Sequence, residues 1–244
     1  MAEQLNNSYI HIENLSKSFG FNKVLDGINL QFEKGDIVAL FGPNGAGKTT
    51  LIRILSTIIK GDEGSISISG FDIKNEVQNI RNELGLLSHE NFLYQNLTVS
   101  ENLIFFAKLY KIKNHEESIS KKLNSIGIYS KRNELVRNLS SGMKQRVSVV
   151  RTLIHDPNIV LLDEPFVGLD IEGCEYLLQI LSDLKKENKT IIVTTHDLKL
   201  GLHECNKVIV ISNGKIRLNE SIENIDVSCF EGTYKSLIAN RIIP

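Results

Sequence analysis

The stretch Gly42-Pro43-Asn44-Gly45-Ala46-Gly47-Lys48-Thr49-Thr50 reads G-x-x-x-x-G-K-T, a pattern typical of loops that bind phosphate groups. Residues 37–41 form a short apolar run suited to a buried strand, and residues 51–55 continue as a helix. Glycines lack a Cβ atom, so the loop backbone can curl and direct its N–H groups at a polyphosphate. The helix start adds unpaired N–H groups and a positive dipole end. This context predicts a nucleotide site rather than a turn that merely joins strand to helix.

Two side chains of this loop have predicted roles in binding and catalysis. Lys48 would reach the β- and γ-phosphates of ATP, and the Thr49 hydroxyl would bind Mg²⁺. The other loop residues in the predicted nucleotide-binding set are Gly42, Pro43, Asn44, Gly45, Ala46, Gly47 and Thr50.

The composition is that of an ordinary globular protein. The chain has 244 residues, 41% of them hydrophobic, which is enough for one large α/β domain. A net charge of −1 gives no basic field for nucleic acid. The three cysteines are far apart, which argues against a disulfide framework and a zinc site. We find no signal peptide and no apolar run long enough to cross a bilayer, so at a membrane another chain must provide the spans.

The N-terminal segments predict a small antiparallel sheet. Residues 9–13 and 28–32 alternate apolar and polar side chains, as half-buried strands do. Phe19 lies between these segments. An aromatic ring just upstream of the phosphate loop would stack on adenine if exposed, but a packing role suits the same residue.

From Val99 to about Pro157, apolar residues recur at helical spacing with no strand-like segment between them. This segment predicts a helical insertion. It ends in Ser140-Ser141-Gly142, which is typical of a helix N-cap. Ser140 and Gly142 either serve only to begin a helix or offer a hydroxyl and N–H groups to a phosphate.

Carboxylates follow a second apolar run, residues 159–162, at the end where ligands bind in open α/β sheets. Asp163 would bind Mg²⁺, and Glu164 would accept a proton from an attacking water. A surface pair of carboxylates is the alternative. His196 follows the strand predicted over residues 190–195, where it either bonds the γ-phosphate or the water or has a structural role.

We therefore expect one α/β domain over residues 1–244: a P-loop NTPase core with a parallel sheet, an N-terminal antiparallel β subdomain and an inserted α-helical subdomain. The core with its antiparallel part comprises residues 8–84 and 158–218, and the helical subdomain residues 85–157. A hairpin over residues 207–218 precedes a tail, residues 219–244.

Together these segments resemble the ATP-binding subunit of an ABC transporter. Residues 42–50 resemble the Walker A motif, residues 139–143 stand where the signature L-S-G-G-Q belongs, and residues 159–164 resemble Walker B with its catalytic glutamate. Gly168-Leu169-Asp170 is similar to the D-loop, His196 to the switch histidine and Phe19 to the adenine-stacking aromatic. The order and spacing of these elements agree over nearly the whole chain.

The resemblance implies an ATPase that works as a head-to-tail pair, with a second copy of the chain or a homologous subunit. Each ATP would lie with Mg²⁺ between one P-loop and the other subunit's signature motif, so that Ser140 and Gly142 act in trans. Integral membrane permease subunits would convert the opening and closing into transport, at the cytoplasmic face of the cell membrane.

Soluble relatives of this family in DNA repair, chromosome organisation and translation are a competing interpretation. The repair and chromosome types insert a long coiled coil before the signature, and the translation type carries two cassettes per chain; this sequence has neither feature. A regulatory binder without hydrolysis is opposed by the presence of Lys48, Asp163, Glu164 and His196.

Residues 88–103 are similar to ATPase subunits of the haem exporter of cytochrome c biogenesis. Exporters of drugs, lipids and antibiotics share much of this pattern, and haem is the favoured cargo among them. The sequence departs from the family pattern at Ser141 and Met143, in the signature, and at His89, which stands where a glutamine that contacts Mg²⁺ or water is expected.

His89 generates a testable hypothesis. Histidine gains charge near pH 6–7, whereas glutamine does not titrate, so acid should depress ATPase activity more here than in relatives with glutamine. Replacing His89 with Gln should flatten the pH profile of transport-coupled ATP hydrolysis. A profile identical to that of the wild type would contradict the hypothesis.

Overall fold

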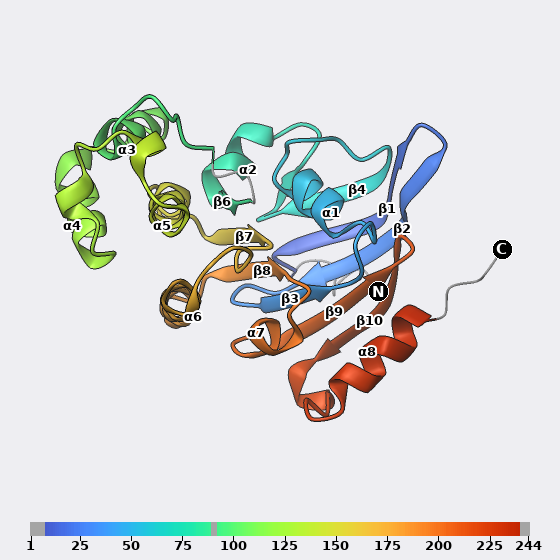
Figure 1. Cartoon of the computed structure of the whole chain (residues 1–244). Coiled ribbons are helices and arrows are strands. Elements are labelled where there is room, and N and C mark those ends of the chain that lie inside the picture. The colour runs from blue at the N-terminus through green and yellow to red at the C-terminus, as the bar shows by residue number, and fades with distance from the viewer. Residues whose placement is uncertain (1–7, 89–91, 240–244) are drawn as a thin grey trace.

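The computed structural model describes residues 8–88 and 92–239 and has two sheets and a cluster of helices (Figure 1). The strands are β1 Ile10–Phe19, β2 Asn22–Phe32, β3 Ile37–Phe41, β4 Glu63–Ile68, β5 Phe71–Asp72, β6 Leu84–Leu87, β7 Ile159–Asp163, β8 Thr190–Thr194, β9 Lys207–Ser212 and β10 Lys215–Ser221. The α-helices are α1 Lys48–Leu55, α2 Val77–Glu83, α3 Val99–Leu109, α4 His115–Ser125, α5 Ser141–Thr152, α6 Ile171–Lys186, α7 Leu198–Leu202 and α8 Phe230–Ala239.

The two sheets divide the core as the sequence predicts. The larger sheet has the order β10-β9-β3-β8-β7-β6, in which neighbouring strands are parallel except for the β9–β10 hairpin. The smaller sheet has the order β2-β1-β4-β5 and is antiparallel. The predicted α/β class, parallel sheet, antiparallel β subdomain and helical insertion are confirmed.

Helix α1 lies between the two sheets (Figure 1). Its apolar side chains Leu51, Ile52, Ile54 and Leu55 are buried along one broad face, whereas Thr49 and Arg53 are exposed. This broad face packs into the core cluster that residues of both sheets form with the helix. The loop between β3 and α1 is therefore held at both of its ends by buried elements.

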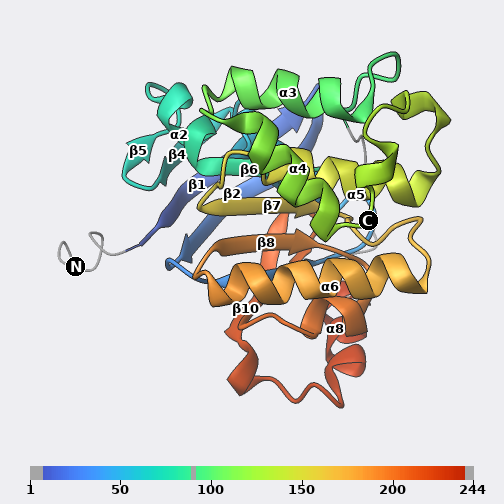
Figure 2. The same ribbon diagram turned by 90° about the vertical axis from the view of Figure 1, so that its left-hand side faces the viewer.

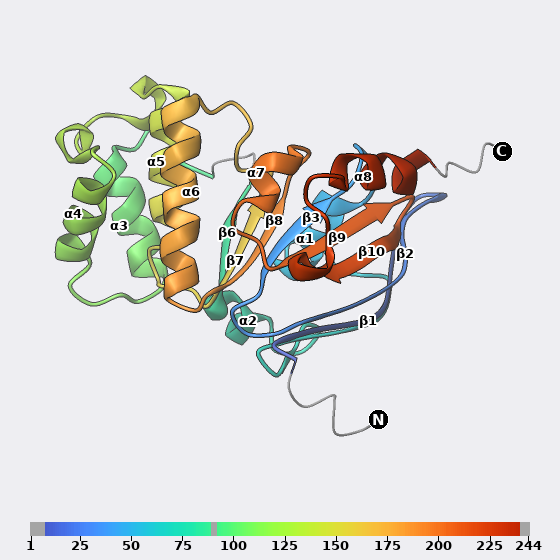
Figure 3. The same ribbon diagram turned by 90° about the horizontal axis from the view of Figure 1, so that it is seen from below.

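The helical subdomain has a hydrophobic core of its own, formed by α3, α4 and α5. These helices lie beyond the β6–β7 side of the parallel sheet (Figures 1 and 3). Helix α6 packs along the parallel sheet, on the face opposite α1 (Figure 2). Among the described residues, no helix combines the length and apolar character needed to cross a membrane.

Two predicted boundaries need correction. Residues 85–87, assigned to the helical subdomain, belong to β6, which pairs in parallel with β7. A Cβ atom on Gly85 would lie 2.8 Å from the Thr152 carbonyl oxygen, so glycine lets this strand pass close to the end of α5. The tail predicted from residue 219 begins inside β10, and its helix α8 packs Phe230 against Phe41, with ring centroids 5.7 Å apart.

His155 connects the helical subdomain to β6 of the parallel sheet. Its Nε2–H donates to the Leu84 carbonyl at 3.0 Å, and its ring stacks on Tyr110 with centroids 3.7 Å apart. Nδ1 is buried, with no hydrogen-bond partner among the described residues. Burial lowers the pKa of His155 from its usual 6.5 to about 4. The ring is therefore neutral in the folded protein at pH 7.

This shift predicts a pH dependence of stability. The unfolded chain takes up the proton first on acidification, so the stabilisation is full above pH 6.5 and is lost as the pH falls toward 4. His155→Gln keeps an N–H donor but does not titrate. Between pH 7 and pH 5, wild type should lose about 1–2 kcal/mol more unfolding free energy than the variant, after discounting for partial exposure. Urea unfolding at both values checks this, and parallel losses would contradict it.

Candidate active site

The phosphate loop has a backbone that requires glycine at Gly47. Its φ angle of 108° lies in the left-handed region, which side chains with a Cβ atom rarely adopt. A Cβ atom there would lie 2.9 Å from the Val24 carbonyl oxygen and 2.6 Å from a Leu25 methyl group. The first turn of α1 can therefore approach β2 closely only with glycine at this position.

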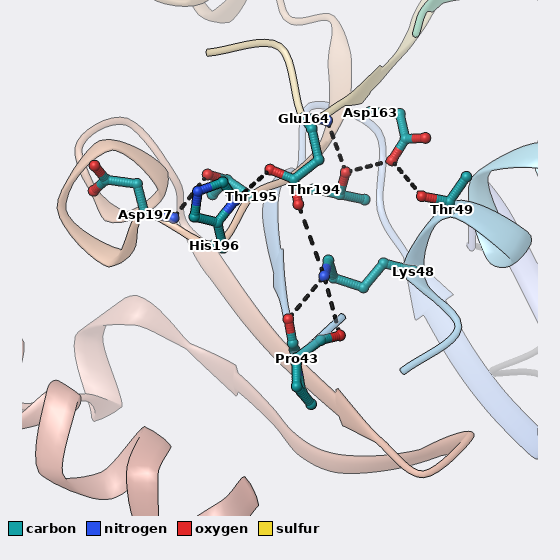
Figure 4. Close-up of polar contacts among 10 residues, drawn as sticks. Pro43, Lys48, Thr49, Asp163, Glu164, Thr194, Thr195, His196 and Asp197 are labelled. Atoms are coloured by element: carbon teal, nitrogen blue, oxygen red, sulfur yellow. Dashed lines mark hydrogen bonds and ion pairs between the residues drawn. The ribbon is translucent and has the colours of Figure 1, made fainter. Parts of the chain in front are cut away.

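Lys48 points back across the loop and is 6% exposed. Its ammonium donates to the Gly42 carbonyl at 2.7 Å and lies 3.7 Å from Glu164 Oε1 (Figure 4). Burial lowers the pKa of Lys48, and the negative charges of Glu164 and Asp163 oppose that effect. A partly desolvated cation of this kind attracts a phosphate strongly.

The carboxylates lie at the carboxyl edge of the parallel sheet, beside the phosphate loop. Asp163 ends β7, and its Oδ1 accepts a hydrogen bond from the Thr49 hydroxyl at 3.1 Å. Glu164 follows directly, and its Oε2 accepts from Nδ1 of His196 at 3.0 Å (Figure 4). Strand β8 lies between β3 and β7 in the sheet, so these groups converge although they are far apart in sequence.

A cavity of about 530 Å³ opens over these groups, a size suited to a small ligand. The predicted residues Thr49, Asp163, Glu164 and His196 line it. The remaining lining residues are Asn44, Ile52, Arg53, Ile58, Leu86, Ser88, Phe92 and Val167. Of these, only Asn44 belongs to the predicted site.

The oxygen atoms of Thr49 and Asp163 fit Mg²⁺. This cation prefers oxygen ligands and takes a few from the protein, with phosphates and waters completing its shell. Since the Thr49 hydroxyl and Asp163 Oδ1 are 3.1 Å apart, they can serve one small ion together. His89, the third predicted metal-binding residue, lies outside the described residues.

Phe19, Ser140 and Gly142 do not line this cavity. Phe19 ends β1 and is 53% exposed, and the Lys17 ammonium lies 5.4 Å from the centroid of its ring. Ser140 is the N-cap of α5, and its hydroxyl accepts from the Met143 N–H at 3.3 Å, which confirms the predicted cap. Their roles toward a nucleotide stay predictions.

Thr194 is a site residue that the sequence reasoning missed. It ends β8, is fully buried and donates to Asp163 Oδ1 at 2.7 Å. The signal was present: a hydroxyl residue closes a buried strand just before His196, as Asp163 closes the neighbouring one. Only the pairing of β7 with β8 shows that the two residues are partners.

The family model described as "ABC transporter" matches residues 25–167. The ABC transporter ATP-binding protein NatA of Bacillus subtilis is 35% identical over 83% of this chain and 84% of its own. An L-cystine import ATP-binding protein of B. subtilis is 33% identical over 85% of this chain and 83% of its own. A Nod factor export ATP-binding protein of Burkholderia pseudomallei is also 33% identical, over 84% of this chain and 68% of its own. The dimeric ATP-binding cassette MJ0796, bound to ADP and phosphate after hydrolysis, superposes with a TM-score of 0.81 at 26% identity, covering 88% of this chain and 100% of that one.

Proposed function

The chain belongs to the ABC transporter family as an ATP-binding, ATP-hydrolysing subunit, and we propose that it drives export through separate membrane subunits. The observation that carries the ATP-hydrolysing part of this function is the convergence of Lys48, Thr49, Asp163, Glu164 and His196 at one edge of the sheet. A cation, an oxygen site for Mg²⁺ and a base held by a histidine are the parts that phosphoryl transfer to water needs.

Each group has a distinct task in the proposed reaction. Lys48 would exchange its present partners, the Gly42 carbonyl and Glu164, for phosphate oxygens. Thr49 and Asp163 would hold Mg²⁺, which neutralises charge on the phosphates. Glu164 would take a proton from water as the water oxygen bonds to the γ-phosphorus and the bond to ADP breaks. His196, at 3.0 Å, would orient that carboxylate.

We propose that a second subunit completes the site. Ser140 caps the start of α5, is exposed and does not line the cavity, so this helix N-terminus would be accessible to a nucleotide on another subunit. The dimeric state of the MJ0796 cassette supports a pair. ATP between the two subunits would hold them closed, and hydrolysis would release them.

Glu164→Gln should separate binding from hydrolysis. The amide cannot take the proton but keeps the size of the side chain, so turnover should fall at least 100-fold while ATP still binds. Light scattering should then detect a dimer with ATP and a monomer with ADP. Lys48→Ala, which removes the phosphate cation, should stay monomeric with either nucleotide. Undiminished hydrolysis by Glu164→Gln would overturn the role assigned to this residue.

An exposed apolar surface provides a candidate contact for the permease. Tyr94, Phe105 and Leu109 are 50%, 43% and 63% exposed, and the Tyr94 and Phe105 rings meet edge to face at 5.2 Å. Phe92, 43% exposed, lies two residues before Tyr94 and also lines the cavity. Exposed aromatic clusters of this kind mark protein contacts. Contact here would link the permease to the nucleotide site.

We favour export over import on the similarity of residues 88–103 to exporter ATPases and on the Nod factor export relative. Import is the second candidate, because an L-cystine import subunit is as similar. Haem remains the cargo suggested by residues 88–103 alone. The membrane subunits would make the contacts with the cargo. Identifying these subunits therefore decides both the direction of transport and the cargo.

Capture from native membranes tests the transporter function. Full-length Glu164→Gln with ATP should co-purify a chain with several membrane spans, and adding Phe105→Glu should abolish that capture. Val227→Glu is the matched control. Like Phe105, Val227 is an exposed apolar residue (53% exposed), but it lies outside the helical subdomain. A permease of cytochrome c maturation would support haem. Ribosomes or nucleic acid instead of a membrane protein would contradict the proposal.

A further inference from the structure

Thr194 contacts both carboxylate residues of the site at once. Its hydroxyl donates to Asp163 Oδ1 at 2.7 Å and accepts the Glu164 backbone N–H at 3.0 Å (Figure 4). Its carbonyl accepts the same N–H at 3.1 Å. The side chain is 0% exposed, so water does not compete for these bonds.

The chemistry of the partners fixes the direction of these bonds. An ionised carboxylate only accepts, so the one proton of the Thr194 hydroxyl must point at Asp163. The oxygen then has lone pairs left, and the Glu164 N–H uses one. The Thr49 hydroxyl donates to the same Asp163 oxygen at 3.1 Å, so two hydroxyls from different elements orient one carboxylate.

The Glu164 backbone depends on the same residue. Its φ angle of 53° lies in the left-handed region, which costs free energy for a residue with a Cβ atom. Such a conformation persists only where the surroundings hold it. Here both acceptors of the Glu164 N–H belong to Thr194. This backbone turn directs the Glu164 side chain toward Lys48 and His196.

We propose that Thr194 is a positioning residue for ATP hydrolysis, whose hydroxyl sets the orientation of Asp163 toward Mg²⁺ and of Glu164 toward water. This inference rests on the functions proposed above for those two residues. Because Thr194 ends β8 two residues before His196, its hydrogen bonds also connect the strand that precedes the histidine to the carboxylate residues. Its loss would therefore affect turnover and the response to Mg²⁺ more than nucleotide binding itself.

Thr190 provides a matched control. It is the first residue of the same strand, is also 0% exposed, and its hydroxyl accepts the Gly35 N–H at 3.0 Å. Thr190→Val and Thr194→Val each remove one buried hydroxyl from β8 at nearly constant volume. A role in packing or strand stability would make the two variants alike.

The test compares Thr194→Val, Thr194→Ser and Thr190→Val in the full-length chain. Thr194→Val should lower kcat about 10- to 100-fold, with KM for ATP within about 3-fold of wild type. Calorimetric titration with ADP should show the gain in affinity on adding Mg²⁺ shrinking at least 3-fold. Thr194→Ser, which keeps the hydroxyl, and Thr190→Val should both stay within about 3-fold of wild type.

Specific outcomes would overturn the inference. Wild-type kcat in Thr194→Val would do so, as would an equal loss in Thr190→Val or a failure of Thr194→Ser to restore turnover. If thermal unfolding shows that Thr194→Val does not fold, Thr194→Ala supplies the same comparison. Asp163→Asn and Glu164→Gln are run in parallel: if these retain turnover, the proposed functions of the carboxylates are wrong, rather than the positioning function of Thr194 alone.

Discussion

The buried ammonium of Lys48 is the constraint on which the site depends. A lysine that is 6% exposed loses most of its hydration, so the fold must supply oxygen atoms in place of water. It does so with the Gly42 carbonyl, from the loop itself, and with Glu164, which follows β7 and lies 116 positions after Lys48 in the chain. The negative charges of Glu164 and Asp163 thus stabilise the cation, and in the proposed function phosphate oxygens would take their place.

That arrangement requires a particular scaffold. The loop can face the carboxylates only because β3 and β7 flank β8 in one parallel sheet, which brings their carboxyl ends to the same edge. Helix α1 buries a broad apolar face between this sheet and the antiparallel one. Burial of that helix therefore also fixes the helix start that presents Lys48 and Thr49.

The helical subdomain relates to the site differently, because it packs on its own core and meets the parallel sheet near β6. Its helix α5 has the exposed Ser140 as N-cap, and Ser140 does not line the cavity. Its aromatic residues 105 and 106 adjoin Tyr94, close in sequence to the cavity-lining Phe92. The subdomain thus offers one surface to a second ATPase subunit and another to a membrane subunit in the function proposed here.

The sequence by itself determined the phosphate loop, the α/β class, both sheets and the carboxylate pair, because each of these shows as a motif or a hydrophobic periodicity within a short stretch of residues. Lys48, Thr49, Asp163, Glu164 and His196 were all found in this way. Only the tertiary structure decided that β6 belongs to the core, that α8 covers Phe41, and that Thr194 holds both carboxylates. These facts depend on strand order and on contacts between distant segments. The sequence around a short apolar run does not show which strand it pairs with, and the sequence around a buried threonine does not show which residues it hydrogen-bonds.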